Sequence, residues 1–332
     1  MVTFARMALA VLAGAWAMVP AAAEEAPILR IHTYDSFAAA WGPGPALKSG
    51  FEATCACVVE FIATESAIVA LRRVQLEGKS SAADIVLGLD TAIMGEARAT
   101  ALFAPHGLDL SHLVVPMTDA DFVPFDYGYF AFVYDKDLVP DPPTSFEALI
   151  AMPKSFKIVI ADPRSDTPGL GLVLWIQTAY GDRAPEIWQG LKPHILTLTR
   201  GWSEAYSLFL KGEADMVLSY TTSPAYHAIS ENDASYAAAD FGGHYAQVEV
   251  AAILKSSEQQ DLAREFLAYL ISPEAQKLIP TTNWMYPVAD IGADLPPAFS
   301  NLVQPRGMLL LDEDTVTANK AVWIEQALAA IR

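Results

Sequence analysis

Phe122-Val-Pro-Phe-Asp-Tyr-Gly-Tyr-Phe-Ala-Phe-Val-Tyr-Asp135 is a long aromatic stretch that no helical pattern interrupts. At roughly 3.3 Å per residue, a strand of about a dozen residues is long enough to cross from one lobe of a protein to another. The alternative is one long antiparallel strand inside a single sheet. A second extended run, at residues 245–254, is the candidate for a return crossing.

Strand and helix patterns alternate before this stretch. Thr64 is expected to cap the second helix, and the apolar strand at residues 84–90 is expected to be buried on both faces. The β-α-β-α-β order predicts a parallel sheet with crossover helices. The predicted strands are residues 28–33, 58–62 and 84–90, and the predicted helices are residues 46–51, 65–78 and 91–102.

The alternation resumes after the stretch, which predicts a second lobe. Its strands are expected at residues 157–161, 194–199 and 216–218, its helices at residues 145–151, 172–180, 184–191 and 202–211, and a loop at residues 162–171. Further helices are predicted at residues 259–270, 273–279 and 314–331. We therefore predict an α/β protein of two lobes, each a mainly parallel sheet flanked by helices, with a ligand cleft at the hinge.

The predicted organisation has four parts. Residues 24–124 form the first lobe, residues 125–248 form the second, and residues 249–332 return to the first, with the lobe of the last helix left open. Residues 1–23 resemble a secretory signal. A single positive charge at Arg6 precedes an apolar run, and the small residues Ala21-Ala22-Ala23 that follow the run suit a cleavage site. Cleavage before Glu24 would release a soluble protein. An uncleaved anchor is the alternative.

The net charge limits the class of ligand that the protein can bind, and the cysteine content limits the chemistry of its thiols. The 332 residues include 39 acidic and 21 basic side chains, for a net charge of -18. This balance argues against nucleic acid as a partner and favours cationic ligands. Cys55 and Cys57 are expected to be either buried thiols or a local disulfide. The six histidines do not pair at metal-ligand spacing, so no metal site is predicted.

Motifs for catalysis are missing from the sequence. It contains no glycine-rich phosphate cradle of the Walker or dinucleotide type. Gly201-Trp-Ser-Glu lacks the second glycine that a nucleophile elbow needs. Asp126, Asp162 and Glu249 could form acid–base pairs, although extended segments also place carboxylates at hinges for structural reasons. The residues alone therefore give no strong indication of an enzyme.

Aromatic and hydroxyl side chains gather at the predicted strand ends. After the apolar strand at residues 216–218, the chain turns into Ser223-Pro224, an expected N-cap followed by proline at the first helical position. Such a turn presents unpaired backbone N–H groups at the carboxyl edge of a sheet. Aromatic walls with hydroxyls suit a flat, cationic, heteroaromatic ligand. The strand-end aromatics are Tyr34, Trp41, Trp202, Tyr220, Tyr226, Trp284 and Tyr286.

Long ungapped blocks resemble the periplasmic thiamine-binding proteins of bacterial ABC importers over nearly the whole mature chain. The resemblance implies a two-lobed, type II-like periplasmic-binding-protein fold that closes over thiamine or its phosphate esters. It also implies a binding protein without a cofactor, and not an enzyme, that delivers its ligand to a membrane permease driven by a cytoplasmic ATPase. A monomer is expected. The blocks are Tyr34-Asp-Ser-Phe-Ala, Trp41-Gly-Pro-Gly-Pro, residues 83–90 and 122–135, Thr167-Pro-Gly-Leu-Gly171, Gly201-Trp-Ser-Glu-Ala-Tyr206, residues 218–227 and Asn283-Trp-Met-Tyr-Pro-Val288.

The same resemblance implies a set of ligand contacts. Those from the second lobe are Trp202, Tyr220, Thr221, Thr222 and Ser223, with Thr167 on the facing loop. Tyr34, Tyr226 and Trp284 are expected to form ring walls.

Two positions depart from the family pattern. Ser66-Ala67 stands where relatives have aspartate and glycine, which removes a carboxylate unless Glu65 replaces it. Asp166 stands where relatives have serine, and an anion there opposes phosphate by like-charge repulsion unless Arg164 neutralises it. We therefore predict a preference for free thiamine over its mono- and diphosphate.

Two other functions remain open from the sequence. Thiamine-cleaving enzymes share the two-lobed architecture and use a cysteine nucleophile, for which Cys55 and Cys57 are the only thiols. Iron-binding relatives use grouped tyrosines, which Tyr220 and Tyr226 resemble, although tryptophan-rich edges suit a metal poorly.

Overall fold

The computed structural model describes residues 26–332. The predicted signal peptide, residues 1–23, lies outside the described residues. Among the helices of residues 26–332, none combines the length and the apolar character that a membrane crossing requires.

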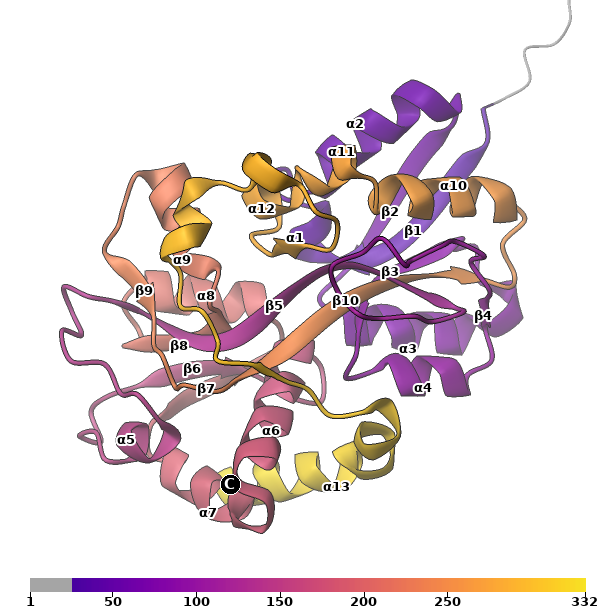
Figure 1. Ribbon diagram of the computed structural model, residues 1–332. Helices are drawn as coiled ribbons and strands as arrows, with labels where there is room; N and C mark the ends of the chain where they lie inside the picture. Colours follow the sequence, from indigo (N-terminus) through magenta and orange to yellow (C-terminus); the bar gives the residue numbers. More distant parts are fainter. Residues whose placement is uncertain (1–25) are drawn as a thin grey trace, which may run out of the picture.

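Two long strands cross the middle of the molecule (Figure 1). They are β5 (Phe122–Asp135) and β10 (His244–Leu254), and they pair antiparallel. The first part of β5, through Tyr129, pairs with β10, whereas Phe130 to Tyr134 pair with β8 (Met216–Tyr220). The strand therefore takes part in the sheets of both lobes, as a lobe-to-lobe crossing requires. The lobe boundaries after residues 124 and 248 stay predictions.

The first lobe is built on three parallel strands in the order β2-β1-β3 (Val58–Thr64, Ile28–Tyr34 and Ile85–Asp90), followed by antiparallel β10. Strand β3 is buried on both faces, as its apolar run predicts. Ile85 and Leu87 pack in one core with α2 (Gly44–Cys55) and α10 (Gln260–Leu270), whereas Val86 and Leu89 pack in another with α3 (Ala67–Glu77) and α4 (Met94–Ala99). The sheet therefore lies between two helical layers.

The second lobe repeats this plan. Strands β7 (Ile195–Thr199), β6 (Ile158–Ala161) and β8 are parallel, and β5 runs antiparallel beside β8. Helices α5 (Phe146–Ile150), α6 (Thr167–Tyr180) and α7 (Ala184–Leu191) contribute to the core on one face. Helix α8 (Trp202–Leu210) packs on the other face through Ala205, Tyr206 and Phe209. The strands of each lobe are thus parallel as predicted, and the crossing strands make the whole sheet mixed.

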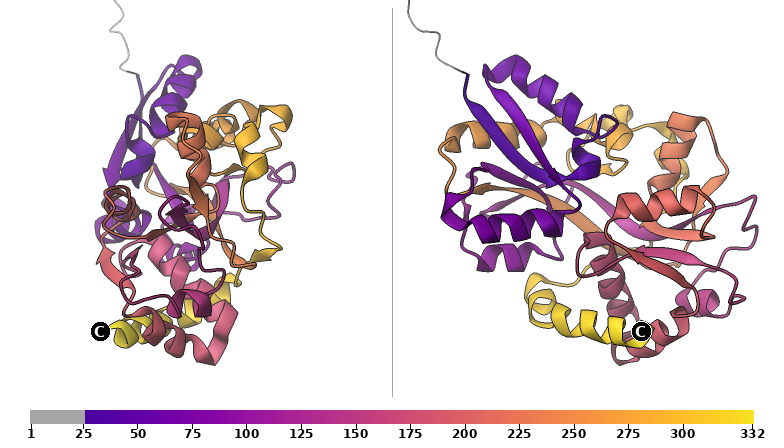
Figure 2. Two further views of the ribbon diagram at one scale, coloured as in Figure 1. Left: turned by 90° about the vertical axis from the view of Figure 1, so that its left-hand side faces the viewer. Right: turned by 180° about the vertical axis from the view of Figure 1, so that it is seen from behind.

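The last helix, α13 (Glu313–Ile331), packs against α6 and α7 and also against α4. Figure 2 shows it in yellow along the bottom of the molecule. It therefore contacts helices on both sides of the crossing strands. The remaining short elements are α1 (Asp35–Ala38), α9 (Ser223–Tyr226), α11 (Pro273–Gln276), α12 (Ile279–Thr282), β4 (Phe103–Ala104), β9 (Tyr236–Ala238), β11 (Tyr286–Pro287) and β12 (Met308–Leu309).

Several predicted helix boundaries are wrong. Helix α6 begins at Thr167, inside the predicted loop, because Pro168 fits a first helical turn and Gly169 lets the helix approach β6. A Cβ at Gly169 would lie 2.3 Å from the carbonyl oxygen of Ala161. The predicted helix at residues 273–279 is split into α11 and α12.

The predicted caps also shift. Ser66, not Thr64, caps α3, since its Oγ accepts a hydrogen bond from the backbone N–H of Val69 at 3.2 Å. Thr222 occupies the cap position before α9, so Ser223 is its first residue.

Cys55 and Cys57 are joined in a disulfide at the end of α2. Of the two alternatives that the sequence leaves open, the structure has the local bridge.

Candidate functional site

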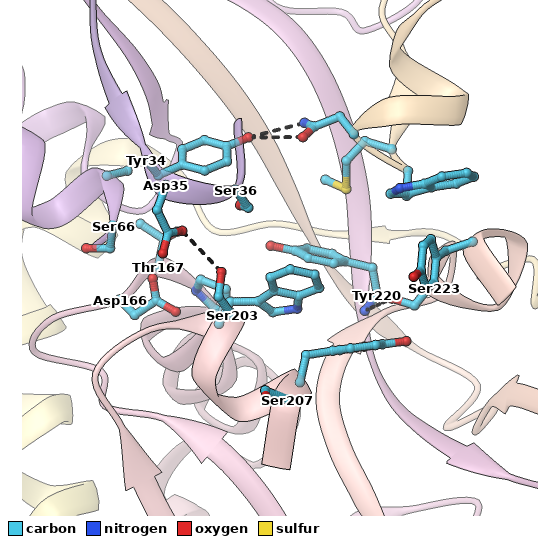
Figure 3. A pocket seen from close by; sticks show the side chains of 18 of the residues that line it. Tyr34, Asp35, Ser36, Ser66, Asp166, Thr167, Ser203, Ser207, Tyr220 and Ser223 are labelled. Atoms are coloured by element: carbon cyan, nitrogen blue, oxygen red, sulfur yellow. Dashed lines mark hydrogen bonds between the residues drawn. The ribbon is translucent and has the colours of Figure 1, made fainter. Parts of the chain in front are cut away.

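A cavity of about 520 Å³ lies between the two lobes. This volume falls within the range of about 300–1,000 Å³ that is usual for small-molecule sites. The first lobe contributes the ends of β1 and β2, and the second contributes the segments that follow β6, β7 and β8. Figure 3 shows Tyr34, Asp35 and Ser36 facing Asp166, Ser203 and Tyr220 across it.

Aromatic side chains form the walls of the cavity. The Trp202 indole N–H donates a hydrogen bond to the Ser219 hydroxyl at 2.9 Å, and its ring lies 5.0 Å from that of Tyr206. Tyr226 and Trp284 meet edge to face at 5.3 Å. These contacts fix the rings in place before a ligand arrives, which reduces the entropy that binding must overcome.

Two backbone positions support the walls. Gly88 has φ +97°, and a Cβ there would lie 2.4 Å from the Tyr34 ring, so only glycine leaves room for that ring. Trp284 itself has φ +59°, a left-handed conformation that bulky residues rarely adopt. Strain of this kind gathers at functional sites.

A chain of hydrogen bonds runs along the floor of the cavity. The Tyr34 hydroxyl donates to Glu249 at 2.7 Å, and the Gln247 amide donates to the other oxygen of Glu249 at 3.3 Å. The Tyr220 hydroxyl donates to Gln247 at 2.7 Å. Residues 247 and 249 lie on the crossing strand β10, so the floor of the cavity is part of the hinge.

The charged side chains that line the cavity are mostly acidic. Asp35, Glu65, Asp166 and Glu249 are the acids, and Lys211 is the one basic residue among the lining residues of the described chain. Burial, and then the nearby Asp35 carboxylate, raise the pKa of Asp166 to about 8.

Asp166 has no cationic partner. Its Oδ2 atom is buried and has no hydrogen-bond partner among the described residues. Arg164 pairs with Asp162, and Arg200 pairs with Glu65 at 3.1 Å. Arg164 therefore does not neutralise Asp166. Glu65 lines the cavity one position before Ser66, and its replacement of the family carboxylate stays a prediction.

The lobes touch along one rim of the cavity. Ser66 donates its hydroxyl proton to the carbonyl oxygen of Ser165, and Ser203 donates to Asp35 at 3.1 Å. The second contact is visible in Figure 3. Together with the Arg200–Glu65 pair, these contacts show the lobes closed against each other on this side.

Most of the predicted site residues meet at the cavity. Thr221 and Thr222 do not line it: both are fully buried, and the Thr221 N–H donates to the carbonyl oxygen of Tyr129 at 2.8 Å. Their contact with ligand stays a prediction. The predicted residues that line the cavity are Tyr34, Ser66, Ala67, Asp166, Thr167, Trp202, Tyr220, Ser223, Tyr226 and Trp284.

Sequence reasoning missed other lining residues. Asp35 and Ser36 directly follow β1, and Asn283 precedes Trp284, so their positions beside predicted residues were an available signal. Glu249 lies within a strand, and the sequence offers it as one carboxylate of a possible acid–base pair but not as a ligand contact. Tyr206 lies within a helix, where no sequence pattern distinguishes it from a structural residue.

The tyrosine and histidine side chains that could serve as metal ligands are hydrogen-bonded to other groups of the protein. Residues 26–332 contain no group of three or more histidine, cysteine, aspartate or glutamate side chains arranged to hold a metal ion. Tyr226 donates its hydroxyl proton to Glu231 at 3.1 Å, and His227 lies against Tyr206 at 2.9 Å. His244 lies 2.8 Å from the carbonyl oxygen of Phe130. His227 and His244 therefore serve separate structural contacts.

Residues 35–277 match the family model described as bacterial extracellular solute-binding protein. The chain belongs to this family. This solute-binding protein is 50% identical over 308 residues to the thiamine-binding periplasmic protein of Escherichia coli (strain K12), which covers 92% of the chain and 94% of that protein. It is 48% identical over 312 residues to the protein of the same name from Brucella abortus biovar 1 (strain 9-941), covering 93% of each.

Solved structures give the same result for this solute-binding protein. A periplasmic thiamin binding protein superposes with a TM-score of 0.90 at 49% identity, covering 95% of this chain and 99% of that one. Iron-bound HitA from Pseudomonas aeruginosa superposes with a TM-score of 0.74 at 20% identity, covering 92% of this chain and 99% of that one, which shows a shared fold. The predicted family and two-lobed fold are confirmed.

Proposed function

We propose that this protein captures thiamine in the periplasm and delivers it to the membrane permease of an ABC importer that a cytoplasmic ATPase drives. The observation that carries the proposal is a cavity with aromatic walls and a mainly acidic lining, between lobes that contact each other across it. Thiamine presents two flat heteroaromatic rings, one of them a cationic thiazolium. Cation–π contacts of about 0.5–2 kcal/mol each favour such a ligand, and relatives about half identical to this chain are named thiamine-binding.

The protein acts by binding alone, as a monomer without a cofactor. A thiamine-cleaving enzyme of this architecture needs a cysteine nucleophile, and both cysteines of the chain are joined in a disulfide outside the cavity lining. Iron as the solute is disfavoured because the Tyr220 and Tyr226 hydroxyls already donate to Gln247 and Glu231. Affinity comes from burial of the two rings, from hydrogen bonds and from closure of the lobes.

Native mass spectrometry of the purified protein, combined with calorimetric titration, tests this function. We expect a mass increase equal to one thiamine, or stoichiometric binding when thiamine is added to protein that has been unfolded and refolded to remove ligand. Incubation with thiamine should release no free thiazole. A protein that neither carries nor binds thiamine would contradict the proposal.

Asp166 is expected to set the preference among thiamine and its phosphate esters. Since the pKa of Asp166 is about 8, its ionised fraction grows between pH 7 and pH 8.5. The ionised carboxylate attracts the thiazolium and repels a diphosphate. The dissociation constant of thiamine diphosphate divided by that of thiamine should therefore exceed one and rise over this interval. We expect the ratio to approach ten, which corresponds to a difference of about 1.4 kcal/mol in binding free energy.

Calorimetry of wild type and Asp166→Ser with both ligands measures this ratio. The variant should lower the ratio and remove its rise with pH. Asp182→Ser makes the same charge change at an exposed position and should leave the ratio as in wild type. Equal or tighter diphosphate binding by wild type at pH 8.5 would show the preference to be wrong.

A further inference from the structure

Two carboxyl groups face each other where the crossing strands form the floor of the cavity. Glu249 on β10 is paired in register with Asp126 on β5, directly before a shift in the register of the two strands. Asp126 is 0% exposed and Glu249 is 6% exposed. Glu249 lines the cavity, and Asp126 lies behind it. A buried carboxyl pair is costly to maintain without compensation, so its presence at this position calls for a function.

Among residues 26–332, only neutral groups donate hydrogen bonds to the pair. Glu249 accepts from the Tyr34 hydroxyl and the Gln247 amide, and Asp126 Oδ2 accepts from the Asn283 amide at 2.5 Å. The other oxygen of Asp126 is buried without a hydrogen-bond partner in the described chain. These donors stabilise negative charge on the floor of the cavity, and they supply no positive charge to balance it.

The surrounding titratable groups are acids and phenols. Burial raises the pKa of Asp126 to about 7, and burial together with Asp126 raises that of Glu249 well above its ordinary value. Two carboxyls this close do not ionise together in a buried site, so one proton is shared between them. The groups that face the pair are Tyr34 from β1, Asp90 from the end of β3 and Tyr220 from β8. Behind them, Lys320 of α13 acts on Asp90, and Asp166, in the cap position before α6, acts on Tyr220.

We infer that the Asp126–Glu249 pair is the counter-ion of the bound ligand and selects a positively charged ring over a neutral one. The inference rests on the proposed function for the identity of the ligand. When a cationic ring enters the closed cavity, its charge favours the singly ionised pair, so a pair that holds two protons releases one of them to the solvent and keeps the other as the shared proton. A neutral ring makes the same wall contacts and displaces no proton. Cation affinity therefore falls as the pH falls from 8 to 6, because protonation removes the negative charge of the pair.

The test compares thiamine with thiochrome, its neutral fused-ring oxidation product. Glu249→Gln preserves the size of the side chain and removes its charge. We expect this variant to reduce the ratio of thiochrome to thiamine dissociation constants at least tenfold relative to wild type. Titrations in phosphate and in Tris, which differ in ionisation enthalpy, count the protons released. That number should be positive for wild type at pH 7 and smaller for the variant, in which Asp166 still releases protons and the carboxyl pair no longer does.

Two further variants complete the design. Asp126→Asn leaves the carboxyl that lines the cavity, Glu249, and removes the acid behind it, so it should keep more of the preference for thiamine than Glu249→Gln does. This result would separate the charge of the pair from a loss of folding in Glu249→Gln. Glu60→Gln makes the matched change at a side chain that pairs with Arg30 at 3.4 Å and does not line the cavity, so its ratio should equal that of wild type.

The outcomes separate the inference from the function. If wild type binds thiamine and Glu249→Gln keeps both the wild-type ratio and the wild-type proton count, the inference is wrong and the proposed function stands. If wild type binds neither ligand, the proposed function is wrong, and the inference with it.

Discussion

Replacement of Trp202 by alanine is expected to weaken thiamine binding at least tenfold, a loss of about 1.4 kcal/mol. The indole lines the cavity at the first position of α8, where its N–H donates to Ser219 at 2.9 Å and its ring rests against Tyr206. Alanine removes both the aromatic face offered to the thiazolium and the apolar area that the ligand covers. Calorimetric titration gives the dissociation constant directly.

Two variants isolate the cause of this loss. Trp202→Phe keeps an aromatic face and loses the hydrogen bond to Ser219, so its dissociation constant should lie between those of wild type and Trp202→Ala. Trp323→Phe alters a partly buried tryptophan on α13, outside the cavity lining, and should bind as wild type does. A dissociation constant unchanged in Trp202→Ala would refute a ligand contact at this position.

Replacement of Trp175 by alanine should lower the free energy of unfolding by about 3–5 kcal/mol, the range for truncation of a buried tryptophan. Trp175 is 1% exposed on α6, and its N–H donates to the carbonyl oxygen of Gly243 at 3.0 Å. The rings of Phe146 and His244 lie 5.0 Å and 5.2 Å away. Alanine leaves a large cavity and an unpaired carbonyl oxygen in the core of the second lobe.

Urea unfolding followed by circular dichroism measures this change. Trp175→Phe retains most of the volume and loses the hydrogen bond, so its loss should be smaller. Because Trp175 does not line the ligand cavity, the folded fraction of either variant should bind thiamine with nearly the wild-type dissociation constant. A loss below about 1 kcal/mol for Trp175→Ala would mean that the surrounding rings collapse into the space.

The two-lobed plan could be predicted because its signals are local. A long extended aromatic run and regular strand–helix alternation are visible in single segments of sequence, and they correctly located β5, β10 and most helices. The position of β10 between β3 and β5 could not be predicted, since segments more than a hundred residues apart decide that pairing. The start of α6 was missed because residues 162–171 carry the proline and glycine residues of a loop, and the close approach of Gly169 to Ala161 of β6 that requires the glycine is a feature of the folded chain.

Some residues of the candidate site could be predicted from local sequence, and others could not. Tyr34, Trp202, Tyr220 and Trp284 could be predicted because aromatics beside polar residues at strand ends are poorly explained by core packing. Glu249 could be named as a partner of Asp126 or Asp162 in an acid–base pair, but its place at the cavity could not be predicted, because a glutamate inside an apolar strand gives no sign of which ligand surface it faces. Its proposed role depends on Asp126, which lies opposite it on the neighbouring strand β5.

The left-handed backbone of Trp284 carries a consequence for how this protein evolves. Such a conformation at a bulky residue costs on the order of 1–3 kcal/mol, which glycine would recover. Selection for thermal stability therefore favours replacement of Trp284 by glycine, whereas selection for ligand binding favours the tryptophan. At position 284, selection for stability and selection for ligand binding therefore favour different residues. A more stable variant of this protein should be sought at other positions, with Trp284 kept.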